Sequence, residues 1–154
     1  MVHFRLKTYI RIFLIADRDK GKDKKHQEFI RQSLESHQNF NYHVLNVREI
    51  ENILSLDQLR KYLPLITKID HDLLVGTPMR WDQQKTRYLG EYLVDKLGAE
   101  NLPKGLVAKS GTLKTYYKTK LAEVVSSQVT WGELSDEAKE LTKQLYKFIK
   151  ESNH

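Results

Sequence analysis

The feature that most constrains the fold is an almost unbroken apolar run over residues 9–16, which ends abruptly at an aspartate. A run this rich in Ile, Phe and Leu is typical of a strand buried on both faces, as strands of parallel sheets are. We expect a helix over residues 23–37 and a second short strand over residues 42–47, where two valines and a tyrosine favour extended backbone. Together these segments predict a right-handed βαβ unit with parallel strands.

Beyond residue 48 the apolar residues recur at helical spacing. A first helical stretch is expected to end at Pro64, because proline lacks the amide hydrogen that a helix interior needs. A further amphipathic helix is predicted over residues 83–97, with Gly98 as its stop, and another over residues 112–126.

Two capping signals stand near the C-terminus. Thr130 and Glu133 have the spacing of a capping box, and Ser135 can cap a last helix. The fold class we predict is therefore α/β, with a short parallel βαβ-type sheet near the N-terminus followed by a mainly helical C-terminal part. We expect a single domain over residues 1–154, with an α/β part over 1–56 and a helical part over 57–154.

Composition excludes several classes of protein. There is no cysteine, which excludes disulfides and thiolate metal sites and fits a cytoplasmic setting. No apolar stretch approaches the roughly 20 residues of a membrane helix, so no membrane partner is expected. The pattern G-x-x-x-x-G-K-[ST] is absent, so this chain alone is not expected to be a P-loop ATPase. A net charge of +6 fits a polyanionic partner, but an ordinary basic surface fits it as well.

Asp17 and Asp19 follow directly after the first predicted strand. Ligands of open parallel sheets bind at the carboxyl ends of the strands, and a spacing of two residues points both side chains the same way in extended backbone. Mg²⁺ or Mn²⁺ would relieve the repulsion between the two carboxylates. The alternative is a solvated turn whose charge is neutralised by Arg18 and Lys20.

Glu49 and Glu51 follow the second predicted strand. Because parallel neighbours bring their carboxyl ends together, one of these glutamates could complete a cation site with the aspartates. If the segment is helical, residues two apart point to different sides, so only one faces that site. The alternative is an ordinary helix start, where acidic residues favour the positive end of the helix dipole.

A basic segment without any acidic residue spans residues 101–122. Lysines of this kind contact phosphates without reading sequence, and tyrosines among them can stack on bases. The alternative is a solvated helix face, with Tyr117 in the core and Tyr116 more open. The predicted nucleic-acid-binding residues are Lys104, Lys109, Lys114, Tyr116, Lys118 and Lys120.

The segments "FLIADRDKG" and "YHVLNVREIENIL" resemble the C-terminal part of a TOPRIM domain, in the version attached to OLD-family and related ATPases of bacterial defence systems. The resemblance is clearest over residues 9–56. It implies metal-dependent cleavage of phosphodiester bonds in nucleic acid, DNA more than RNA. In that reading Asp17 and Asp19 hold Mg²⁺ or Mn²⁺, while either Glu49 or Glu51 shares or positions a second ion. We assign Glu51 as a ligand and Glu49 as a catalytic residue.

The resemblance also implies a lysine that neutralises phosphate charge, for which Lys109 or Lys114 is the best match, and a partner ATPase domain or subunit. TOPRIM nucleases require a further glutamate on an earlier strand, whereas no acidic residue precedes Asp17 here. Three explanations stay open: a piece of a longer protein, a degenerate module, or a site completed by a partner chain, with a homo-oligomer included. The competing hypothesis is a non-catalytic basic domain for nucleic-acid binding or assembly.

Overall fold

The computed structural model describes residues 11–18, 23–36 and 40–152. Strand β1 (Ile12–Ala16) pairs in parallel with β2 (Phe40–Val44), and helix α1 (Asp23–Ser36) connects them. In the register of this sheet Ile12 lies opposite Phe40 and Ala16 opposite Val44. The predicted parallel βαβ arrangement is thus confirmed, but the second strand begins and ends earlier than the predicted 42–47. Asp19 and the start of the predicted first strand lie outside the described residues.

The rest of the chain is mainly helical, as predicted. Its elements, in chain order, are η1 (Ile50–Ile53), α2 (Leu56–Thr67), α3 (His71–Gly76), α4 (Trp81–Gln84), α5 (Leu89–Leu97), η2 (Ala99–Asn101), α6 (Thr115–Gln128), η3 (Trp131–Glu133) and α7 (Asp136–Ser152). None of the described helices is long and apolar enough to cross a membrane.

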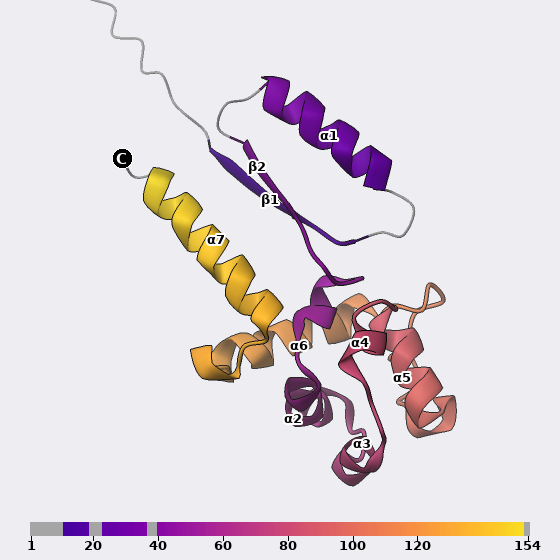
Figure 1. Ribbon diagram of the computed structural model, residues 1–154. Helices are drawn as coiled ribbons and strands as arrows, with labels where there is room; N and C mark the ends of the chain where they lie inside the picture. The colour runs from indigo at the N-terminus through magenta and orange to yellow at the C-terminus, as the bar shows by residue number, and fades with distance from the viewer. Residues whose placement is uncertain (1–10, 19–22, 37–39, 153–154) are drawn as a thin grey trace, which may run out of the picture.

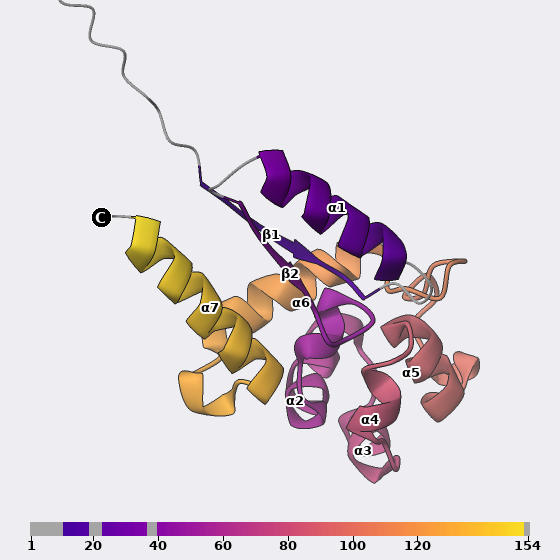
Figure 2. The same ribbon diagram turned by 45° about the horizontal axis from the view of Figure 1, so that its top comes forward.

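The two-stranded sheet lies between α1 and α7, which flank its opposite faces (Figures 1 and 2). On one face the ring of Phe29 meets the rings of Phe40 and Tyr42, with centroids 5.9 and 5.3 Å apart. On the other, Phe13 meets Phe148 edge-on at 5.3 Å. Helices on both faces fit a first strand that is apolar on both sides. The prediction that this strand is buried on both faces was wrong, because two flanking helices leave Ile12 and Leu14 43% and 37% exposed.

The main hydrophobic core lies among the helices below the sheet (Figure 1). Helices α2 and α6 make the most extensive helix–helix contact there, and α3 and α5 contribute further buried side chains. Its fully buried members are Leu59, Tyr62, Leu63, Leu74, Leu89, Tyr92, Leu93, Leu106, Leu113 and Leu121. A smaller core under the sheet joins Leu45, Val47 and Leu141, so α7 is anchored to the residues that follow β2.

Several predicted boundaries were wrong. Pro64 does not end its helix, because α2 continues to Thr67. The lost backbone hydrogen bond is offset by burial of Leu63 and Thr67 on either side, and the Thr67 hydroxyl bonds the Leu63 carbonyl at 2.6 Å. The helix predicted over 83–97 is divided into α4 and α5, and the one predicted to begin at 112 begins at Thr115.

The predicted caps are confirmed. Thr130 and Glu133 form a capping box, and the Ser135 hydroxyl accepts from the Ala138 amide at 3.2 Å at the start of α7. Gly98, with φ of +81°, ends α5. Lys61 donates to Glu133 at 2.6 Å, and this bond, followed by those from Thr130, lowers the Glu133 pKa to about 2.

Candidate functional site

The carboxyl ends of the two strands meet, as the sequence predicts. The Leu45 amide donates to the Ala16 carbonyl at 2.9 Å, and the Arg18 amide donates to the Val47 carbonyl at 3.2 Å. Backbone hydrogen bonds therefore join the two segments beyond the strands, on either side of Asp17, which is exposed at this edge. Asp19, the second predicted ligand, lies outside the described residues. One carboxylate at a strand end is thus placed as expected.

Glu49 turns away from solvent at this edge. Its side chain is only 3% exposed. One carboxylate oxygen accepts the Leu89 amide at 2.8 Å, at the N-terminus of α5, and the other accepts the Lys118 ammonium at 2.9 Å. A carboxylate at this position also interacts favourably with the α5 dipole. Glu49 therefore connects the sheet end to α5 and α6.

Lys118 is shared between both predicted glutamates. Its ammonium lies 2.9 Å from Glu49 and 3.1 Å from Glu51, whose side chain is 10% exposed. Burial acts to lower the pKa of Lys118, but the hydrogen bonds to Glu49 and Glu51 outweigh it, so the pKa is raised. We call these three residues the acidic–lysine cluster. Lys118 supplies a positive charge between the two carboxylates.

The described carboxylates do not form a complete ligand set for Mg²⁺ or Mn²⁺. Within the described ranges there is no group of three or more His, Asp or Glu side chains that could hold a metal ion. Glu49 and Glu51 face Lys118 instead. We therefore derive no metal-dependent step from this geometry, and the roles predicted for Asp17, Asp19, Glu49 and Glu51 stay predictions.

Residues 104–114 form a tight hairpin-like loop that leads into α6. The Ala108 amide donates to the Thr112 carbonyl at 2.8 Å, and the Lys114 amide donates to the Leu106 carbonyl at 2.9 Å. Lys104, Lys109 and Lys114 are exposed on this loop. This part of the acid-free segment is thus folded into one unit, which we call the basic hairpin. Three predicted nucleic-acid-binding lysines lie together on it.

Gly90 allows the basic hairpin to pack closely on α5. A Cβ atom at Gly90 would lie 2.7 Å from the Gly111 carbonyl oxygen and 2.8 Å from a Val107 methyl carbon. The adjoining Glu91 amide donates to the same Gly111 carbonyl at 2.7 Å. The close approach and this hydrogen bond fix the hairpin to the first turn of α5.

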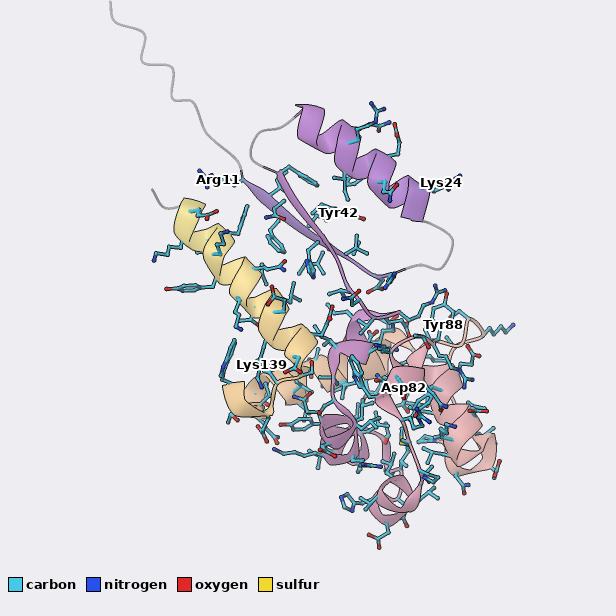
Figure 3. The ribbon with its side chains drawn as sticks, viewed as in Figure 1. Arg11, Lys24, Tyr42, Asp82, Tyr88 and Lys139 are labelled. Carbon is cyan, nitrogen blue, oxygen red and sulfur yellow. The ribbon has the colours of Figure 1, made fainter. Side chains whose placement is uncertain are left out.

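Arg48 and Tyr88 connect the strand end to the basic hairpin. The Arg48 guanidinium lies 4.4 Å from the Tyr88 ring centroid, bonds the Tyr88 hydroxyl, and also reaches the Arg18 carbonyl at 3.5 Å. Tyr88 in turn lies against Gly111. It lies where the segment before α5 meets that loop (Figure 3). The edge that carries Asp17 and the hairpin are therefore neighbours.

The first turns of α6 carry the remaining predicted residues. Tyr116 is 64% exposed, and its ring meets Tyr117 edge-on with centroids 5.2 Å apart. Lys120 pairs with Glu123 at 2.8 Å on the outer face of this helix. Tyr117 packs against the main core, as the sequence predicts. Of the six predicted nucleic-acid-binding residues, Lys118 alone belongs to the acidic–lysine cluster.

An apolar pocket adjoins the acidic–lysine cluster. It has a volume of about 290 Å³ and lies between η1 and α6, with Glu51 and Lys118 at its margin. Ile50, Leu54 and Val125 contribute to its apolar wall. Its size is at the lower end of small-ligand sites, so one large apolar side chain would fill much of it.

Sequence reasoning did not find the contributions of Arg48, Tyr88 and Gly90. Each depends on a contact between segments about 20 to 40 residues apart, and a single sequence carries no local signal for such a contact. No protein-family model, curated protein or solved structure matches this chain.

Proposed function

We propose that this chain is a nucleic-acid-binding module of TOPRIM-like type. The observation that carries the proposal is the basic hairpin, on which Lys104, Lys109 and Lys114 are exposed and no acidic residue occurs. Lysines in this arrangement contact phosphates and release counterions, which favours binding without regard to sequence. Nearby acids are themselves paired: Glu91 with Arg87 at 3.3 Å, and Glu123 with Lys120.

The binding experiment compares two triple variants of equal charge. Lys104, Lys109 and Lys114 are changed to glutamine in one, and Lys143, Lys147 and Lys150 of α7 in the other. We expect the hairpin variant to lose at least about tenfold in affinity for labelled DNA at low salt, because up to three phosphate contacts are removed. Fluorescence anisotropy of the labelled DNA measures the affinity of each variant. Equal losses in both variants would show that only net charge matters.

A metal-dependent nuclease is the second candidate. The specific observation in its favour is that Asp17 is exposed where the strands end, beside the Arg48–Tyr88 link to the basic hairpin. A phosphodiester held by the hairpin lysines would therefore lie near this edge. Asp19 and acids supplied by further segments or an ATPase partner would have to complete a site for Mg²⁺ or Mn²⁺. Without them the module binds nucleic acid and does not cut it.

Cleavage of supercoiled plasmid tests this candidate. We expect the chain alone to show little or no cleavage with Mg²⁺ or Mn²⁺, because Glu49 and Glu51 are held by Lys118. The matched variant is Asp17→Asn, which keeps the shape of the side chain and removes its charge. Strong cleavage by the wild type that is lost in this variant would contradict the expectation and establish an autonomous nuclease.

A further inference from the structure

Tyr116 is an exposed aromatic residue beside the basic hairpin. It follows Lys114 by two positions, on the first turn of α6, and 64% of its surface is exposed. Its edge-on contact with Tyr117, which packs on the main core, braces the ring against a fixed neighbour. A large aromatic side chain held at the surface in this way is available for contact with a flat partner.

Positive charge lies on both sides of this ring along the chain. Lys114 is exposed before it, and Lys120 follows one helical turn later. Lys120 lies four positions after Tyr116 on α6, so the two side chains share one face of that helix, and the hydrogen bond to Glu123 raises the pKa of Lys120. The first turn of α6 carries no acidic residue. An aromatic ring within a lysine-lined path is the arrangement that single-strand binders use.

We infer that the basic hairpin and Tyr116 together form a site for single-stranded nucleic acid, with Tyr116 stacking on an unpaired base. The inference rests on the proposed function and names its substrate class. In a duplex the bases are already stacked and paired, so Tyr116 gains no base contact and only the lysines contribute. In a single strand the phosphates follow the lysines while one base lies on the ring. Every base has an aromatic face, so no sequence preference is expected.

The test is anisotropy at low salt with an oligothymidylate of about 20 nucleotides and a duplex of the same length. We expect Tyr116→Ala to weaken single-strand binding about 5- to 150-fold and to leave duplex binding unchanged. Tyr116→Phe keeps the ring and should bind like the wild type. The control is Tyr146→Ala on α7, because Tyr146 is 69% exposed and distant in sequence from the hairpin.

Each outcome decides a separate point. If the wild type binds both probes equally, or if Tyr116→Ala binds the single strand as tightly as Tyr146→Ala does, the single-strand site is wrong. If the triple lysine variant of the hairpin still loses DNA affinity in that case, the proposed function stands without the single-strand site. If the wild type binds neither probe at low salt, the proposed function and this inference are both wrong.

Discussion

Replacing Lys118 with methionine is expected to lower the free energy of unfolding by about 3 to 5 kcal/mol. The Lys118 ammonium forms ion pairs with both Glu49 and Glu51, and Glu49 is only 3% exposed. Methionine roughly keeps the length of the side chain and removes its charge, so two nearly buried carboxylates would lose the ammonium between them. Among the described residues only Glu49 would keep another partner, the Leu89 amide. Denaturant unfolding followed by circular dichroism measures the loss.

The matched control for this change is Lys120→Met on the same helix. Lys120 also bonds a glutamate, but both partners are about half exposed, so this change should cost at most about 1 kcal/mol. Adding Glu49→Gln and Glu51→Gln to Lys118→Met should recover part of the loss, because no unpaired buried charge would remain. Equal losses for Lys118→Met and Lys120→Met would contradict the buried cluster.

Gly90→Ala is expected to have the second largest effect, about 1 to 3 kcal/mol of lost stability. The new methyl group would lie within 3 Å of two backbone carbonyl oxygens, those of Gly111 and Thr112, and of a Val107 methyl carbon. Backbone atoms cannot swing aside as a flexible side chain can, so the basic hairpin must move away from α5. We therefore also expect weaker DNA binding in this variant.

Gly76→Ala is the control, because nothing lies within 4 Å of the Cβ position at Gly76. It should leave stability and DNA binding close to those of the wild type. Thermal unfolding and anisotropy on the same samples compare the two variants. A Gly90→Ala protein as stable as Gly76→Ala would show that the hairpin does not pack on α5 as described.

The α/β part could be predicted because its signals are local. The apolar run that ends at Asp17 predicts a strand buried on both faces, and α1 and α7 do flank both faces of the sheet, but Ile12 and Leu14 stay 43% and 37% exposed. The capping pair of Thr130 and Glu133 is equally local, because two residues three positions apart and their reciprocal hydrogen bonds define it. The existence of such elements is specified by near neighbours and could be predicted, whereas the burial of the first strand depends on how far the flanking helices cover it and was predicted wrongly.

The arrangement of the candidate site could not be predicted in the same way. Sequence reasoning assigned Lys118 to nucleic-acid binding and Glu49 to catalysis, and it did not foresee that the two pair with each other across 69 positions. Pro64 failed as a stop because burial on both sides of it outweighs a local backbone preference. In each case a contact formed only in the folded chain decides what the residue does.

The salt dependence of DNA binding tests the central claim most directly. The logarithm of the association constant should fall linearly with the logarithm of salt concentration, with a slope set by the number of phosphates contacted. Changing Lys104, Lys109 and Lys114 to glutamine should make that slope shallower by about 2 to 3. The triple variant of Lys143, Lys147 and Lys150 should keep the wild-type slope. Unchanged slope in the hairpin variant, or equal changes in both, would contradict a phosphate-binding hairpin.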